Sequence, residues 1–251
     1  MSRRAGAIPL GFIAGAILLA ACTEIPTGAD DVLSMQVNSL PWPSVVVGDT
    51  LRDSTGVVSP ATISAFNYSG DVIAAPAVRF SALDRGIRVD SLTGMVRGDS
   101  VRSGARILAT FKGLSSTTTI AVTLRPDTVA LSNGRDSLSY SVADTTANLS
   151  NPIGVKVLHG TTQDSAVASW FVSYLILSPT TAGLAQIVDD GRRASSADTT
   201  DATGIALRRI KLDPTKLVAA VDSIIVQASV KYRGINVKGS PARLVLKVKP
   251  K

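Results

Sequence analysis

The chain has 251 residues, a formal net charge of +7 and 45% hydrophobic residues. The chain has a single cysteine, Cys22, which excludes an intrachain disulfide. It also has a single histidine, His159, and one cysteine with one histidine are too few ligands for a typical zinc site. Glu24 is the one glutamate, whereas Val, Ile, Thr and Ser are abundant, so strands are favoured over helices and an all-β fold is expected.

The N-terminal segment has the layout of an export signal. Arg3 and Arg4 precede the uncharged run 5–23, which contains Leu19-Ala20-Ala21-Cys22. A basic start, a short apolar segment and small residues before a cleavage site are typical of a secretory signal peptide. The four residues that end at Cys22 resemble the cleavage motif of bacterial lipoproteins. The resemblance implies lipidation of Cys22 and a stable membrane anchor. Two or three acyl chains keep a protein bound to a membrane, whereas a single chain binds only weakly and reversibly.

Two other interpretations of this segment stay open. An uncleaved transmembrane helix needs about 20 apolar residues, and 19 uncharged residues run from Ala5 to Thr23. A plain signal peptide without lipid is the other. The Arg3-Arg4 pair resembles a twin-arginine signal, but Ala5-Gly6-Ala7 lacks a bulky apolar residue, so the general secretory pathway is expected. Thr23 rather than Asp follows Cys22, which resembles the pattern that sends lipoproteins of diderm bacteria to the outer membrane, so an outer-membrane location in the cell envelope is expected.

After the signal the sequence divides into a tether and two domains. Pro26, Gly28 and the pair Asp30-Asp31 show little periodicity, which is typical of a linker. The remaining length suits two domains of roughly 100 residues each. The predicted organisation is a signal peptide at 1–21, a tether at 22–39, a first domain at 40–125 and a second domain at 126–251.

Strands are predicted wherever apolar and polar residues alternate, because successive side chains of a strand point to opposite faces. In the first domain the alternating runs are 78–80, 87–89, 105–111 and 120–124. In the second they are 138–142, 153–157, 170–177, 224–230 and 244–248. Turn signals every 8 to 12 residues or so indicate an all-β sandwich. Segment 182–204 is predicted to be rich in loops, and 216–221 to form one helical turn.

The excess positive charge lies near the C-terminus. Residues 205–251 hold 11 Lys and Arg against 2 acids, whereas 23–204 hold 13 against 17. A basic face of this kind suits anionic polysaccharide, lipid headgroups or nucleic acid. Arg243, Lys247 and Lys249 alternate with apolar residues, however, as the solvated face of a strand does. Because no nucleic-acid motif or set of stacking aromatics accompanies them, no nucleic-acid partner is expected.

Two segments resemble bacterial Ig-like domains. Residues 78–98, with Thr93-Gly94 at a hairpin, and 104–110 look like group 2 of this family over roughly 36–124, although Phe80 stands where the family usually has Trp. Residues 198–206 are similar to the invasin-type group 1 signature. The resemblance implies two Ig-like β-sandwich domains in tandem after a cleaved signal peptide. Such domains serve as spacers or adhesive modules, and no functional residue carries over from the family.

Candidate sites for chemistry are few. His159 lies near the end of a predicted strand without a recognisable triad setting, so it is interpreted as a surface or turn residue and no catalytic site is assigned. Trp170, Phe171 and Tyr174 could form a carbohydrate platform, but their apolar surroundings favour the core, with one aromatic facing outward. Trp42, between Pro41 and Pro43, is expected to be exposed or packed at the base of the first domain.

Calcium is the one metal hypothesis, because it binds carboxylate oxygens and four aspartates lie close together in sequence: Asp189, Asp190, Asp198 and Asp201. Their spacing does not fit an EF-hand loop, and aspartate is common in turns, so these residues are interpreted as turn residues and no metal is assigned. No phosphate-binding glycine loop occurs and no cofactor is expected.

The expected function is that of a non-catalytic cell-envelope lipoprotein with a surface binding, adhesion or spacer role. Its expected partners are a membrane, through Cys22, and a surface protein or polysaccharide ligand. The alternative is a carbohydrate-binding or enzyme-accessory lipoprotein that uses an exposed aromatic or calcium-bearing patch.

Overall fold

The fold is all-β, as the composition predicts. A computed structural model describes residues 28, 31–74, 77–144, 148–160, 165–217 and 221–251. Strands make up the regular structure of these residues, apart from the 3-10 turn η2 (Pro214–Lys216). Within the same ranges no helix is long and apolar enough to cross a bilayer. The predicted signal peptide and Cys22 lie outside the described residues.

The first domain is a sandwich of short sheets. One sheet has the order β1-β3-β4, the facing sheet has the order β2-β9-β8-β5, and β6 and β7 form a separate hairpin. The strands are β1 (Ser34–Val37), β2 (Ser44–Val46), β3 (Ile63–Phe66), β4 (Val72–Ile73), β5 (Arg79–Ala82), β6 (Ile87–Val89), β7 (Val96–Gly98), β8 (Arg102–Phe111) and β9 (Leu114–Thr123).

The second domain is a larger sandwich of two five-stranded sheets. One sheet has the order β10-β12-β17-β15, with β13 added beside β12, and the other has the order β11-β21-β18-β14-β16. A small hairpin, β19-β20, projects from it. The strands are β10 (Thr128–Asn133), β11 (Arg135–Tyr140), β12 (Ile153–His159), β13 (Ser165–Ala166), β14 (Phe171–Ser178), β15 (Ala185–Val188), β16 (Ala197–Thr199), β17 (Ile205–Leu212), β18 (Ser223–Ser229), β19 (Lys231–Tyr232), β20 (Ile235–Asn236) and β21 (Ala242–Pro250).

Both domains share an Ig-like arrangement at their N-terminal edge. The chain first pairs antiparallel in one sheet, β1 with β3 and β10 with β12, and then crosses to the other. There β2 runs parallel to β9, with Val45 opposite Val122, and β11 runs parallel to β21, with Leu138 opposite Val248. Each domain is therefore closed by a parallel pair between its second strand and its final strand.

Alternation correctly predicts which side chains enter the cores. Ala105, Ile107 and Ala109 on β8 are fully buried, and so are Leu244 and Leu246 on β21. The first core is completed mainly by Val45, Leu51, Val96 and Ile120, and the second mainly by Leu138, Ile153, Trp170, Ile210 and Ile224. Burial of such faces is the main stabilising contribution available to a chain without disulfides.

Two stretches predicted to lack strands contain them. β1 lies inside the segment assigned to the tether, and Val37 is buried, so the first domain begins before residue 40. The loop-rich segment 182–204 contributes β15 and β16, one to each sheet. Both were missed because strands of three or four residues give too little alternation to detect.

The helical turn also differs from the sequence interpretation. It is expected at 216–221 but occurs earlier, as η2, where Asp213 accepts a hydrogen bond from the Thr215 N–H. Residues 218–220 lie outside the described residues.

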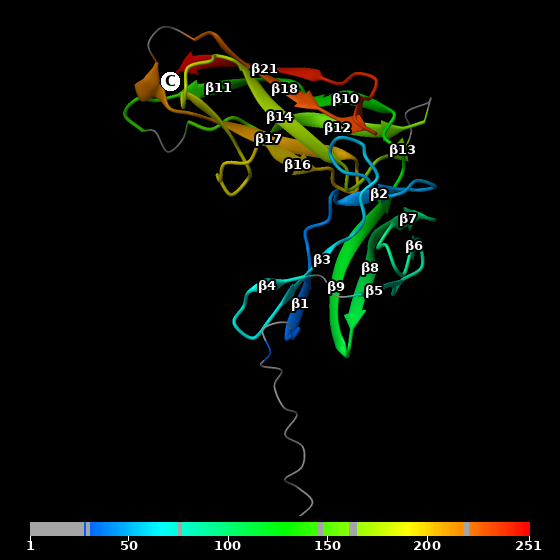
Figure 1. The fold of residues 1–251 in the computed structure, drawn as a ribbon. Helices are drawn as coiled ribbons and strands as arrows, with labels where there is room; N and C mark the ends of the chain where they lie inside the picture. The colour runs from blue at the N-terminus through cyan, green and yellow to red at the C-terminus, as the bar shows by residue number, and fades with distance from the viewer. Residues whose placement is uncertain (1–27, 29–30, 75–76, 145–147, 161–164, 218–220) are drawn as a thin grey trace, which may run out of the picture.

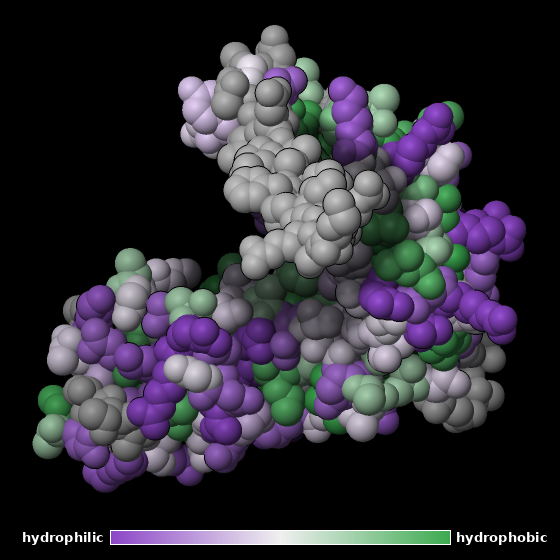
Figure 2. Space-filling model, turned by 90° about the horizontal axis from the view of Figure 1, so that it is seen from below, coloured by the Kyte–Doolittle hydropathy of each residue, from purple (hydrophilic) through white to green (hydrophobic). Residues whose placement is uncertain are grey.

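The two domains meet at one end of each sandwich and are set at an angle (Figure 1). β9 ends at Thr123 and β10 begins at Thr128, and among the described residues no strand of one domain pairs with a strand of the other. The C-terminus lies at the end of the second domain that points away from the first. Seen from below, the second domain extends to the left as a lobe with a largely hydrophilic surface (Figure 2).

Two leucines of the second domain provide a matched test of this core. Leu244 is fully buried and Leu175 is 57% exposed. We expect Leu244→Ala to lower the free energy of unfolding by about 2–5 kcal/mol, because it leaves a cavity, and Leu175→Ala to change it by less than about 0.5 kcal/mol. Urea denaturation followed by circular dichroism measures both. Equal losses would contradict the assignment of β21 to the core.

Candidate functional site

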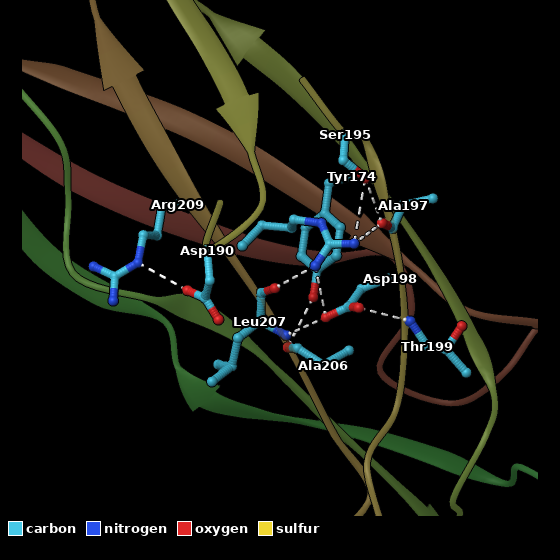
Figure 3. A network of polar contacts seen from close by, with 10 residues as sticks. Tyr174, Asp190, Ser195, Ala197, Asp198, Thr199, Ala206, Leu207 and Arg209 are labelled. Carbon is cyan, nitrogen blue, oxygen red and sulfur yellow. Dashed lines mark hydrogen bonds and ion pairs between the residues drawn. The ribbon is translucent and has the colours of Figure 1, made fainter. Parts of the chain in front are cut away.

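Each of the aspartates considered for calcium is engaged by a partner of its own. Asp189 accepts hydrogen bonds from the backbone and side chain of Arg193. Asp190 meets Arg209 on β17 at 3.0 Å (Figure 3). In the described part of the chain no group of three or more His, Cys, Asp or Glu side chains is placed to hold a metal ion.

Asp198 belongs to a polar network between β16 and β17. It accepts hydrogen bonds from the N–H groups of Thr199 and Leu207, and it forms a 3.0 Å ion pair with Arg208, whose side chain is largely buried. Close by, the Tyr174 hydroxyl donates to the Ala206 carbonyl at 2.8 Å (Figure 3), and burial raises the pKa of Tyr174 well above its usual value. This network joins β14, β16 and β17 across the sandwich.

Asp201 has the turn role that was predicted. Its carboxylate accepts hydrogen bonds from the Thr203 hydroxyl and from the N–H groups of Thr203 and Ile205. These bonds lower the pKa of Asp201, with the Thr203 hydroxyl as the largest cause. The residue thus shapes the turn that leads into β17.

The predicted aromatic cluster lies in the core. Trp170 and Tyr174 are 4% and 3% exposed, and Phe171 is partly buried. Trp170 and Tyr174 therefore present no flat surface to a sugar ring. The outward-facing member, Phe171, is covered in turn by Trp42 of the first domain, with ring centroids 5.0 Å apart.

Trp42 is neither exposed nor confined to the first domain. It is partly buried and packs against the hydrophobic cores of both domains. Its ring lies 5.8 Å from the Trp170 ring, which in turn meets Tyr232 edge-on at 6.2 Å. Val46 of β2 also belongs to the second core. The junction is therefore a continuous apolar contact, and stacked or tilted aromatic pairs add stabilisation beyond the area they bury.

Asp49 is the polar centre of the same junction. It is 9% exposed and accepts hydrogen bonds from Arg52 of its own domain, from the Tyr232 hydroxyl at 2.8 Å and from Arg233 Nε at 3.0 Å. Burial raises the pKa of Asp49, but the bonds from Arg52, Arg233, the Thr50 N–H and Tyr232 together hold it well below its usual range. A buried carboxylate with this many donors is a strong fixed contact between the domains.

Two turns fit closely together beside Asp49. The β19-β20 hairpin turns at Arg233-Gly234, both with positive φ, as a two-residue type I′ turn requires. A Cβ on Gly234 would overlap the carbonyl group of Thr55, and a Cβ on Gly56 would overlap the backbone of Arg233. Glycine at both positions lets the backbones of the two domains touch.

A small pocket lies at the junction, beside the aromatic contact. Its volume is about 30 Å³, and Trp42, Ser44 and Trp170 are among the residues that line it. The indole nitrogens of both tryptophans and the Ser44 hydroxyl are buried and, within the described residues, have no hydrogen-bond partner. A cavity of this size holds about one water molecule, so it is too small for a substrate or cofactor.

His159 lies at the other side of the junction, where the chain passes between the domains. Its Nδ1 is 2.9 Å from the Arg125 carbonyl and 2.7 Å from Asp127 Oδ2. Burial raises the pKa of Asp127, but the Gly160 N–H and Arg125 outweigh it and keep that pKa below its usual value. His159 is thus the last residue of β12 and is partly exposed, as interpreted from the sequence. Its contacts with Arg125 and Asp127 stabilise the connection between the domains.

Comparisons with known proteins give no family assignment. No protein-family model matches the chain, and no curated protein matches it. Similar solved structures include the Yersinia pseudotuberculosis adhesin InvE, at 15% identity over 86% of this chain and 58% of the adhesin chain, with a TM-score of 0.37. Domains 4 and 5 of the S-layer protein SbsC are 12% identical over 86% of this chain and 96% of theirs, with a TM-score of 0.30.

A third similar structure belongs to an enzyme. A glycosyl hydrolase family 2 member from Bacteroides cellulosilyticus is 16% identical over 75% of this chain and 23% of its own, with a TM-score of 0.31. The chain thus spans little more than half of the adhesin and under a quarter of the hydrolase. At these TM-scores the likeness carries no argument about function.

Replacing Asp49 tests the polar centre of the junction. We expect Asp49→Asn to lower the free energy of unfolding by about 1–3 kcal/mol at pH 7, because two arginines lose their charged acceptor. The folded-state pKa of Asp49 is depressed, so its stabilisation is complete above the unfolded value of about 4 and is lost as the pH falls below it. The difference between wild type and variant should therefore shrink below about pH 4.

Urea denaturation at pH values from 7 to 2 measures this difference. Asp99→Asn is the control, since Asp99 pairs with the exposed Arg88 inside one domain, where solvent screens the pair. A constant difference between wild type and Asp49→Asn at all pH values would contradict the assigned role.

Proposed function

We propose that this chain is a non-catalytic lipoprotein of the cell envelope, anchored in the outer membrane through Cys22, whose two Ig-like domains form a rigid surface spacer that presents its outer end for binding or adhesion. The observation that carries this proposal is the junction. Trp42 belongs to both cores, and Asp49 of the first domain is held by Tyr232 and Arg233 of the second. A spacer needs such a joint, because a linker alone leaves neighbouring domains free to move.

The anchor is supported by the N-terminal sequence, in which Cys22 follows Leu19-Ala20-Ala21. The described domain begins eleven residues after Cys22, at Leu33, whose N–H donates a hydrogen bond to the Phe66 carbonyl. The alternative of a carbohydrate-binding module with an aromatic or calcium-bearing patch gains no specific observation, since Trp170 and Tyr174 are buried and each candidate aspartate has its own partner.

The anchor is tested by comparing wild type with Cys22→Ala in a bacterial host. We expect the wild-type protein to fractionate with membranes and to carry acyl chains on residue 22, and we expect the variant to lack both properties. Mass spectrometry of the N-terminus and membrane fractionation provide the readouts. Wild-type protein with an unmodified cysteine and residues 1–21 still attached would contradict the anchor and favour a single transmembrane helix.

The rigidity of the junction is tested by distance measurement. Spin labels on cysteines introduced at Val101 and Leu175, both exposed, report the separation of the domains in a Cys22→Ala background. We expect one narrow distance distribution in the otherwise unchanged protein and a broad one after Trp42→Ala, because the shared aromatic contact is lost. Double electron–electron resonance measures the distribution, and circular dichroism verifies that each variant is folded.

Tyr68→Ala is the matched control, since Tyr68 is an exposed aromatic of the first domain. It should leave the distribution narrow. A broad distribution without the Trp42 substitution would contradict the rigid spacer while leaving the lipid anchor untouched.

A further inference from the structure

We propose that a cleft at the outer end of the second domain binds acidic polysaccharide through Lys211 and Lys216. The cleft has a volume of about 960 Å³, near the upper end of the range for small-ligand sites. It lies between the ends of β15 and β17, the turn η2 and residues 148–149. The inference goes beyond the proposed spacer and does not depend on its anchor.

The position of the cleft follows from the sheet register. At this end of the sandwich Ala185 of β15 is opposite Leu212 of β17. The other end of β17, where Ile205 follows Gly204, lies near the domain junction. The cleft is therefore at the end of the domain that also carries the C-terminus, away from the first domain (Figure 1). Loops gather at the ends of a β-sandwich, where ligands are commonly bound.

The floor of the cleft is built by neighbouring strands. Lys211 on β17 is opposite Gln186 on β15, and on its other side it is bridged to Leu149. Lys211 and Gln186 are exposed. A cation and an amide thus stand side by side, a combination that can meet a carboxylate and a hydroxyl of one sugar residue.

The wall of the cleft adds a second lysine. Lys216, at the end of η2, extends over Gly183, where a Cβ would lie 2.5 Å from the ammonium nitrogen. Glycine at 183 therefore leaves room for the lysine head group. Asp213 is 3.9 Å from Lys216 Nζ, and its pKa is lowered first by the Thr215 hydroxyl and further by the charges of Lys216 and Lys211. The positive charges of both lysines thus lie close to the same carboxylate, that of Asp213.

The charge in the cleft is positive. Lys211 and Lys216 line it together with one carboxylate, that of Asp213. Lys211 forms no ion pair within the described residues, although its charge interacts electrostatically with the Asp213 carboxylate. A cleft with excess positive charge concentrates anionic ligands.

The lining favours a sugar chain over a nucleic acid. It combines cations with the neutral hydrogen-bonding side chains of Gln186 and Thr215, and none of the described lining residues is aromatic. Single-stranded nucleic acids are held by stacking on aromatic side chains. A polymer with carboxylates and hydroxyls at regular intervals matches the lining better.

The test measures binding of oligogalacturonate to the full chain by isothermal titration calorimetry. The fully methyl-esterified oligomer has the same backbone without charge and serves as the ligand control. We expect the wild type to bind the charged oligomer in preference to the ester, more weakly as salt increases. Lys211→Gln combined with Lys216→Gln should weaken binding about tenfold, from the loss of two exposed charge pairs.

The matched protein control is Arg243→Gln combined with Lys247→Gln. It removes the same charge from exposed positions of β21 and should leave the affinity within about twofold of wild type, a change small against the 1.4 kcal/mol of a tenfold effect. Equal weakening in the two double variants would overturn the proposal, since net charge alone would then explain binding. Equal affinity for the charged and esterified oligomers, or no binding to wild type, would also overturn it.

Discussion

The packing of Trp42 against two hydrophobic cores is the contact on which the arrangement of this molecule depends. Each sandwich could close without the other, because each contains its own buried faces and its own pairing of second and final strands. The relative placement of the sandwiches depends on the indole ring of Trp42, at the point where the chain crosses from β1 to β2. Pro41 and Pro43 flank this residue, and prolines restrict the conformation of the backbone.

Charged side chains in this protein serve mainly to hold backbone segments together. Asp49 joins the domains, Asp198 and Arg208 join β16 to β17, and Asp201 forms the turn before β17. The chain has a single cysteine, so no intrachain disulfide is available to fasten these loops. Buried or partly buried carboxylates fasten the loops instead, and each accepts charge-assisted or backbone hydrogen bonds from several donors.

The sequence predicts the strands of this fold far better than it predicts the junction. Residues 105–111 alternate clearly and form half of the longest hairpin, because burial of one face imposes period two. Asp49 offers no such pattern, since its partners Tyr232 and Arg233 lie more than 180 residues away in the sequence and belong to the other domain. For Trp42 a signal existed: a large aromatic between two prolines before the first long pattern suggests a packing role.

The parallel pairing of the second and final strands affects how each domain responds to a pulling force. Because β2 runs beside β9 and β11 beside β21 in the same direction, the start of the earlier strand and the end of the later one lie at opposite ends of each pair. Tension applied between the start of the earlier strand and the end of the later one then acts along the pair, so it strains the hydrogen bonds between the two strands together, in shear. Resistance to pulling is thus a mechanical property of the strand order itself.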